Sequence, residues 1–203
     1  KDLSDETANK YISYSEDYAY YLKRLRIFKK YTLTEKEEKI ANIKDISGVD
    51  ALTKIYSMIT DSFKFEFDGK IINQEELRKY FRDVNREKRK LAYETYLTKF
   101  KEHNSLLGEI YVSVVNDWIN ENIKIRKFEN PIHVRNLSED IPGEVVNTML
   151  KVIKKNSSIF RDYFKLKAKL LKIKDFQRYD VYAPYSKEEK EYPYEKSKEI
   201  VLD

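Results

Sequence analysis

Apolar residues recur three and four positions apart along most of this chain, and they alternate in only one short stretch. A spacing of three and four gathers side chains on one face of an α-helix, whereas alternation gathers them on one side of a strand. The alternating stretch Phe63–Phe67 is followed by the turn pair Asp68-Gly69 and by Lys70–Ile72, so one hairpin is expected at residues 63–72. The predicted fold class is therefore mainly α: a multi-helix, bundle-like lobe with one small β-hairpin packed against the helices.

Seven helical segments are predicted from this spacing. They are Asp5–Lys30, Thr34–Ile46, Val49–Ser62, Gln74–Arg82, Arg86–Arg126, Pro142–Leu171 and Tyr194–Leu202. Thr34 with Glu37 forms a capping box, and Asn73 is a favoured N-cap residue. Asn156-Ser157-Ser158 is expected to divide the sixth segment, and Phe128–Ile141 is predicted to be a loop.

Two apolar stripes are predicted to face a core. The first helix carries Tyr11, Tyr14, Tyr18, Tyr21, Leu25 and Phe28, which should pack lengthwise on another helix. The long helix carries Ala92, Tyr96, Phe100, Leu107, Ile110, Val114 and Trp118, with His103 on the same stripe. Gly108 lies in the middle of this helix, where it predicts a bend or a close crossing.

The composition excludes several classes of protein. The 203 residues contain no cysteine, which rules out disulfides and thiolate metal sites, and a cytoplasmic location is expected. No apolar run of about 18 residues predicts a membrane span. The net charge of +5 comes from 40 basic and 35 acidic residues, a small surplus that makes nucleic acid an unfavoured partner.

No catalytic residue and no metal ligand is predicted within the chain, and the substrate-binding residues are left unknown. The two histidines, His103 and His133, are thirty positions apart, whereas a zinc peptidase needs two imidazoles on one helical turn. His103 is predicted to be a hydrogen-bonded residue at the edge of a core, and His133 a surface residue of a loop. There is no Gly-X-Ser-X-Gly motif and no glycine-rich phosphate loop.

A basic series could attract phosphates. It comprises Lys165, Lys167, Lys169, Lys172 and Lys174, with Lys151, Lys154 and Lys155 upstream. On a helix Lys165, Lys169 and Lys172 share one face, while Lys167 and Lys174 share another. The charge is thus spread around the helix, which favours a solvated surface over a nucleic-acid site.

Several segments, in order, resemble zinc oligopeptidases of the oligoendopeptidase F type. They are Leu33-Thr34-Glu35-Lys36-Glu37-Glu38, Phe67-Asp68-Gly69, Asn85-Arg86-Glu87-Lys88-Arg89-Lys90-Leu91-Ala92-Tyr93, Asn130-Pro131-Ile132, Lys165-Leu166-Lys167-Ala168-Lys169-Leu170-Leu171, Tyr179-Asp180-Val181-Tyr182-Ala183-Pro184 and Tyr192–Leu202. The fifth segment is a basic helix, and the sixth, Tyr179–Pro184, is predicted to be extended. Lys172 departs from the family, which often has Gly after the Leu-Leu pair.

This resemblance implies that the chain is part of a larger two-lobed, zincin-type oligopeptidase. Residues 1–141 would be the amino-terminal helical lobe, and residues 142–203 would lead into a catalytic domain. In that family zinc is held by a His-Glu-X-X-His helix and a later Glu, all beyond the segment that this chain matches. The parent enzyme would bind zinc and oligopeptides, while these residues would bind no metal, form a wall of the substrate channel and be inert alone.

Two other functions remain open from the residues: a free-standing helical protein-interaction module and a basic nucleic-acid binder. The helix at Tyr194–Leu202 has no capping glycine after it, which is expected of a truncated chain. A truncated chain should also expose an apolar seam where the remaining catalytic portion of the enzyme packs.

Overall fold

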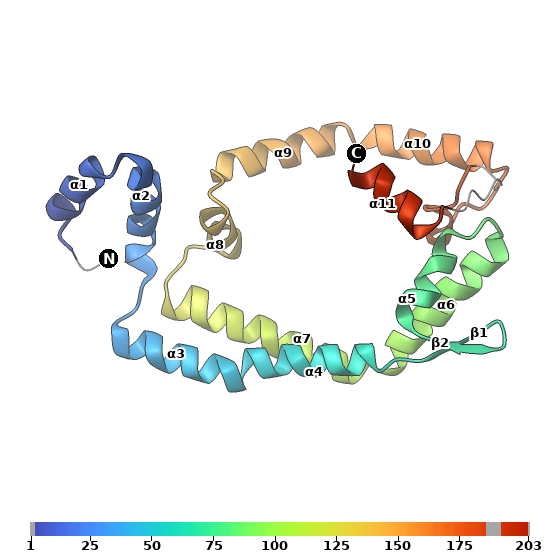
Figure 1. Ribbon diagram of the computed structural model, residues 1–203, viewed down its shortest axis with the longest axis horizontal. Helices are drawn as coiled ribbons and strands as arrows, with labels where there is room; N and C mark the ends of the chain where they lie inside the picture. Colours follow the sequence, from blue (N-terminus) through green and yellow to red (C-terminus); the bar gives the residue numbers. More distant parts are fainter. Residues whose placement is uncertain (1–2, 186–191, 203) are drawn as a thin grey trace. The chain divides into compact units, whose positions relative to one another are not determined.

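The structure is a computed structural model that describes residues 3–185 and 192–202. The helices are α1 (Asp5–Tyr14), α2 (Ala19–Ile27), α3 (Glu35–Ser47), α4 (Val49–Asp61), α5 (Gln74–Lys79), α6 (Arg86–Glu102), α7 (Asn104–Ile119), α8 (Pro131–Ser138), α9 (Gly143–Lys155), α10 (Ser157–Leu170) and α11 (Tyr194–Leu202), and the strands are β1 (Phe65–Phe67) and β2 (Lys70–Ile72) (Figure 1). Short 3-10 helices cover Glu16–Tyr18, Phe28–Tyr31, Tyr80–Arg82 and Arg178–Asp180, and Asn120–Ile125 is π-helical. The mainly α fold with one hairpin is confirmed.

The chain divides into two compact units. Unit 1 comprises Lys1–Met58 and Ser105–Leu150, and unit 2 comprises Ile59–Asn104 and Lys151–Asp203. The division at residue 141 that the sequence suggests concerns the parent enzyme and stays a prediction. Within the described residues, no helix is both long enough and apolar enough to span a membrane.

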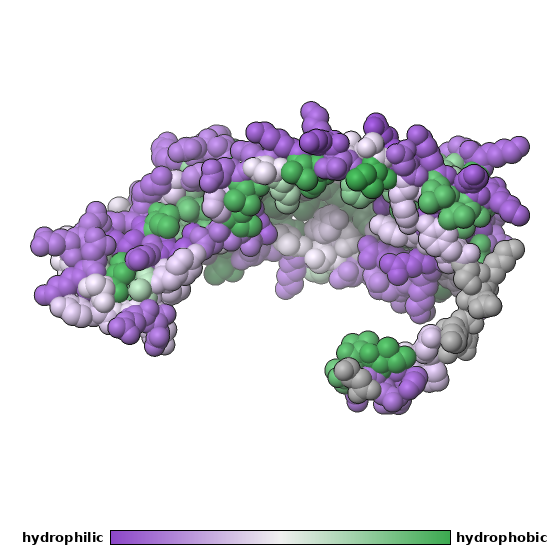
Figure 2. Space-filling view, turned by 90° about the horizontal axis from the view of Figure 1, so that it is seen from above, coloured by the Kyte–Doolittle hydropathy of each residue, from purple (hydrophilic) through white to green (hydrophobic). Residues whose placement is uncertain are grey.

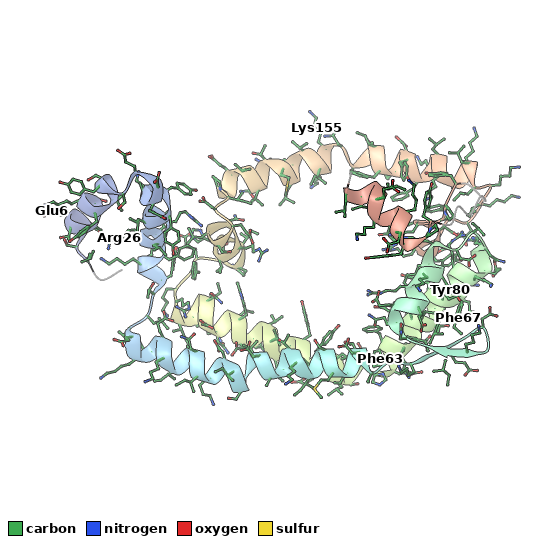
Figure 3. The ribbon with its side chains drawn as sticks, viewed as in Figure 1. Glu6, Arg26, Phe63, Phe67, Tyr80 and Lys155 are labelled. Atoms are coloured by element: carbon green, nitrogen blue, oxygen red, sulfur yellow. The ribbon has the colours of Figure 1, made fainter. Side chains whose placement is uncertain are left out.

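The hairpin in unit 2 forms where alternation predicts it. Phe65 pairs with Ile72 and Phe67 with Lys70 in an antiparallel register, and the turn residues Asp68 and Gly69 have φ of 53° and 72°. Positive φ at both central residues is the geometry that an Asp-Gly pair favours. The hairpin lies beside α5 and α6 (Figure 1), and the rings of Phe67 and Tyr80 lie 4.5 Å apart (Figure 3). The hairpin thus supplies apolar rings to the core of unit 2.

The predicted helix caps are present. The Thr34 hydroxyl accepts a hydrogen bond from the Glu37 amide while the Glu37 carboxylate accepts from the Thr34 amide, which completes the capping box of α3. Asn73 and Glu76 form the same arrangement at the start of α5. The break at Asn156 between α9 and α10 is also confirmed.

The single helix predicted for Asp5–Lys30 is wrong. The chain leaves the helical conformation at Ser15, where φ is −108° and ψ is 67°. Before the break, α1 buries the face that carries Ala8 and Ile12, whereas Tyr11 and Tyr14 are exposed. Tyr18 and Tyr21 are exposed as well, and the predicted core-facing tyrosine stripe does not form.

The continuous helix predicted for Arg86–Arg126 is also wrong. Its α-helical course is interrupted at His103, and after Ile119 it widens into π-helical turns. The core-facing stripe survives in part: Ala92, Leu107 and Ile110 are buried, whereas Trp118 is exposed. A Cβ built on Gly108 meets nothing within 4 Å, so this glycine marks no close crossing.

The predicted loop Phe128–Ile141 contains a helix. Pro131 occupies the first turn of α8, and the Asn130 side chain accepts a hydrogen bond of 2.9 Å from the His133 amide. Asn before Pro is read as a turn signal, but it also suits an N-cap followed by the first helical position. The second reading is the one that the structure bears out.

The core of unit 1 joins α8 to the end of α2 and the end of α7. The rings of Tyr31 and Phe128 stack at 3.6 Å between centroids, and the Tyr31 hydroxyl lies 3.0 Å from His133 Nε2. Beside them Arg126 forms a bidentate ion pair with Glu38, with N–O distances of 2.8 and 2.9 Å. These contacts connect segments that lie about a hundred residues apart in the sequence.

Candidate functional site

The buried carboxylate of Asp180 is the centre of a dense hydrogen-bond network among the described residues of unit 2. Its side chain is fully buried in the 3-10 turn Arg178–Asp180, where two arginines of α6 reach it. Arg86 donates from Nη2 to Oδ2 at 2.9 Å and Arg89 donates from Nη2 to Oδ1 at 2.9 Å. The Gln177 amide also donates to Oδ2 at 3.0 Å. We call Asp180, Arg86 and Arg89 the arginine–aspartate cluster.

The two arginines also bind main-chain carbonyls around the carboxylate. Arg86 Nη2 donates to the Asp175 carbonyl at 2.6 Å, and Arg89 Nε donates to the Tyr179 carbonyl at 3.2 Å. Arg89 Nη1 donates to the carbonyls of Asp83 and Val84, just before α6. The cluster therefore holds the segment after α10 against the start of α6.

This anchoring corrects the prediction that Tyr179–Pro184 is extended. The segment opens with a 3-10 turn, and the Ala183 amide returns to the Asp180 carbonyl at 3.1 Å. The turn brings both the carboxylate of Asp180 and the methyl group of Ala183 into the interior. A buried charge needs compact local structure to gather enough donors around it.

The surroundings of the Asp180 carboxylate suit a structural role and do not suit proton transfer. Burial tends to raise the pKa of its carboxyl group, but hydrogen bonds from Arg86, the Gln177 amide and Arg89 outweigh burial and hold the pKa below its ordinary value. A general base at neutral pH needs a pKa close to that pH and access to a substrate proton. Asp180 has neither property.

Lys167 departs from the rest of the basic series. It is buried, its Nζ donates to the Val181 carbonyl at 2.7 Å, and it lies over the ring of Tyr185 at 4.9 Å. Lys165 and Lys169 of the same helix are exposed. Lys167 thus ties α10 to the turn after Asp180, so it takes no part in an exposed basic surface.

The two histidines are held in different units by local contacts. His103 ends α6, its Nδ1 lies 3.0 Å from the Lys99 carbonyl, and its ring lies 4.6 Å from Phe63, which confirms the predicted core-edge role. His133 is half-buried in α8 against Tyr31 and Phe128. The prediction that His133 is a loop surface residue is wrong, because α8 turns its ring inward.

Among the described residues, one group has carboxylates close enough to share a metal ion: Asp45, Asp117 and Glu121, whose oxygens lie within 4.8 Å of one another. Burial, together with the negative charges of Glu121 and Asp117, raises the pKa of Asp45. Glu121 is paired with Arg126 at 2.7 Å. Zinc sites favour nitrogen and sulfur ligands, so this all-oxygen group does not fit a catalytic zinc.

Several concave surfaces lie among the described residues of unit 2. A cavity of about 460 Å³ beside the arginine–aspartate cluster is lined mainly by apolar side chains. They are Val84, Leu170, Leu171, Ile173, Ala183 and Pro184, accompanied by Arg86, Arg89, Lys172 and Tyr185. A shallower groove of about 270 Å³ lies between α6 and residues 177–179. The cavity beside the cluster contains no carboxylate or imidazole in its lining, so it offers a binding surface without a general base. A hollow of about 480 Å³ between β1 and α6 is lined in part by the carboxylates of Glu66, Glu94 and Glu102.

Two models of known protein families match this chain. The family model described as Oligopeptidase F matches residues 1–65, and the model described as Peptidase family M3 matches residues 80–201. The chain belongs to peptidase family M3. Within that family it is of the oligoendopeptidase F type.

The related proteins agree with this assignment. The chain is 26% identical over 196 residues to oligopeptidase PepF of Bacillus subtilis, covering 91% of this chain and 28% of that protein. It is 28% identical over 102 residues to the chromosomal oligoendopeptidase F of Lactococcus lactis subsp. cremoris, covering 50% of this chain and 17% of the relative. The chain thus spans less than a third of either relative.

Two solved structures share the fold. A peptidase from Chlamydophila abortus superposes with a TM-score of 0.81 at 23% identity, covering 98% of this chain and 35% of that one. Oligoendopeptidase-F from Enterococcus faecium superposes with a TM-score of 0.75 at 19% identity, covering 90% and 38%. The same arrangement of helices thus occurs as part of longer chains.

Proposed function

We propose that these residues belong to a zinc-dependent metalloendopeptidase that hydrolyses peptide bonds in oligopeptides. The observation that carries this proposal is the match of the M3 peptidase model to residues 80–201, which follows the oligopeptidase F match to residues 1–65 in order. The named relatives are oligopeptidases, which supports peptides of limited length as the substrate class.

The zinc of the parent enzyme is held by residues outside 1–203. Supporting this division, His103 and His133 are each held by local contacts in different units, and the carboxylates around Asp45 lack a nitrogen ligand. The part of the chain that the structure describes then acts as scaffold. It shapes the enzyme and positions the peptide substrate, whereas the peptide bond is broken elsewhere in the enzyme.

Within that enzyme we assign these helices to a wall of the substrate channel. Helices held by polar contacts that are buried, as at Asp180, or partly buried, as at Arg126, are stiff enough to limit access by size. A flexible peptide can enter a channel that excludes a folded protein, and closure around the peptide would bring it to the reacting groups. A cytoplasmic location, supported by the absence of cysteine, suits an enzyme that degrades peptides released by other proteases.

The test uses the intact parent enzyme and one cleavable sequence in two settings. The sequence is supplied as a short quenched peptide and as an internal segment of a stably folded protein. We expect cleavage of the peptide to exceed that of the folded protein by at least about a hundredfold, since unfolding must precede entry. Comparable cleavage of both would contradict the channel assignment.

Metal dependence is tested separately on the same enzyme. Removing divalent metal with a chelator should abolish cleavage of the short peptide, and adding back zinc in stoichiometric amount should restore it. Full activity in the metal-free enzyme would overturn the zinc-dependent mechanism while leaving family membership intact.

A further inference from the structure

Helix α10 has three distinct faces. Phe164, buried Lys167 and Leu171 point toward the turn that holds Asp180, and Phe164 meets Phe176 at 5.9 Å between ring centroids. Arg161, Lys165 and Lys169 form a charged face. The third face is apolar and has few contacts within the described residues of unit 2: the Tyr185 hydroxyl donates to the Tyr163 hydroxyl at 3.0 Å, and Leu170 lines the cavity beside Ala183.

This third face is a regular stripe. Its members are Val152 at the end of α9, Asn156 at the junction, and Ile159, Tyr163, Leu166 and Leu170 on α10. Within α10 the members Ile159, Tyr163, Leu166 and Leu170 follow one another at intervals of four, three and four residues, which is the repeat of a helix that packs along another helix. Val152 and Asn156 extend the row toward α9, across the break between the two helices. We call these six residues the α10 seam.

The apolar members of the seam are open to solvent. The exposed fractions are 53% for Val152, 62% for Ile159, 45% for Tyr163, 54% for Leu166 and 59% for Leu170. Figure 2 shows green hydrophobic side chains on this surface of α9 and α10, set between purple hydrophilic ones. Scattered exposed apolar residues are ordinary, but a continuous row of large ones indicates a surface that another segment covers.

The positions beside the seam indicate the chemistry of that segment. Lys155, Asp162 and Lys169 lie in the positions that precede Asn156, Tyr163 and Leu170, where coiled helices place charges that choose a partner. Asp162 is already paired with Lys165 of the same helix at 3.4 Å, which leaves the two lysines to face a partner. No ion pair is recorded for either lysine within the described residues. An amphipathic helix with apolar residues at the same repeat and acidic residues on its flank would complement the seam.

We propose that the α10 seam is the docking site for an α-helix of the same polypeptide that lies outside residues 1–203. The length of the relatives supports this occupant over a second copy of the chain. This fold covers 98% of the present chain but only 35% of the Chlamydophila abortus chain, so most of such a protein lies beyond it. The proposal depends on the chain being part of a longer M3 protein, and it does not depend on the proposed peptidase activity.

Neighbouring residues of α10 give a matched test. The chain has no cysteine, so Leu166→Cys and Lys165→Cys can each be introduced singly, in a parent enzyme without other reactive cysteines. Both positions are exposed in unit 2, one on the seam and one on the charged face. Reaction with a small maleimide is then followed over time in the native enzyme.

We expect the cysteine at 166 to react at least about tenfold more slowly than the cysteine at 165, because a docked helix must open before the thiol is reached. Equal rates would overturn the proposal, since the seam would then be open in the whole enzyme. Protection that disappears on dilution would also overturn it, because a second copy and not the same polypeptide would be the cover. The measurement needs neither zinc nor turnover, so it fails or succeeds independently of the peptidase assays.

Discussion

At the scale of single residues, Asp180 is the group whose loss should cost the most. Asp180→Asn removes the negative charge while Arg89, itself only 3% exposed, stays beside it. The new amide also turns a donor toward the arginines. We expect the free energy of unfolding to fall by about 3 kcal/mol, as is typical when one member of a buried ion pair is removed. Urea unfolding followed by circular dichroism measures it.

The matched control is Asp162→Asn. Asp162 pairs with Lys165 at 3.4 Å on the surface of α10, with 71% of its side chain exposed. This change should alter the free energy of unfolding by less than about 0.5 kcal/mol, because exposed pairs are screened by solvent. Equal losses for the two variants would show that the burial of Asp180 does not determine its contribution.

The same carboxylate predicts an effect of pH. The pKa of Asp180 is lower in the folded protein than in the unfolded chain, so its contribution is complete above the unfolded value of roughly 4 and is lost as pH falls through the folded value. The urea midpoint of the original protein should therefore drop more steeply below about pH 4 than that of Asp180→Asn. If the urea midpoints of the two proteins fell equally steeply with pH below about pH 4, this prediction would be contradicted.

At the scale of elements, local signals were the part that the sequence predicted well. The hairpin, the capping box at Thr34, the N-cap at Asn73 and the break at Asn156 each depend on a few adjacent residues, and all are confirmed. The breaks at Ser15 and His103 were missed because apolar spacing continues across them. Spacing reports which residues share a face only while the helix is unbroken.

The arginine–aspartate cluster could not be predicted from spacing, because its members lie more than ninety residues apart. A usable signal existed nonetheless. Arg86 and Arg89 lie in one of the segments that resembled the oligopeptidase family, and Asp180 lies in another. Two arginines one helical turn apart share a face, so a partner carboxylate in a second family segment was a reasonable guess. The sequence gives no means of choosing Asp180 among 35 acidic residues.

Gly108 in α7 supplies a prediction for an element. A Cβ at this position meets nothing within 4 Å, so Gly108→Ala should raise the free energy of unfolding by about 0.5–1 kcal/mol through helix propensity alone. Gly69→Ala is the control: its Cβ also meets open space, but φ is +72°, and the strain should lower stability by about 1 kcal/mol. Thermal unfolding of both variants would check the pair, and destabilisation by Gly108→Ala would reveal a constraint on α7.

At the scale of the whole molecule, the chain is a set of helices held within each unit by a few polar contacts that are buried or partly buried. Asp180 serves unit 2, and Arg126 with Glu38 serves unit 1. The hydrogen bonding that Arg126 donates to the Glu38 carboxylate is the largest of the influences that raise the pKa of Arg126, so this cation stays charged at every accessible pH. The helices that carry exposed apolar rows, such as the α10 seam, are therefore held in place by contacts within their own unit.

Metal binding provides the last prediction at this scale. If the zinc ligands lie outside residues 1–203, zinc should leave the melting temperature of this chain unchanged. A site that binds zinc should instead stabilise the fold, by about 2.7 kcal/mol when the metal is a hundredfold above the dissociation constant. That would raise the melting temperature by several degrees in a chain of this size.

Differential scanning calorimetry with and without zinc decides whether this chain binds the metal. A rise abolished by Asp45→Asn would place a metal at the carboxylates of unit 1, and one abolished by His103→Ala would place it at the end of α6. Either result would contradict the assignment of these helices to scaffold alone.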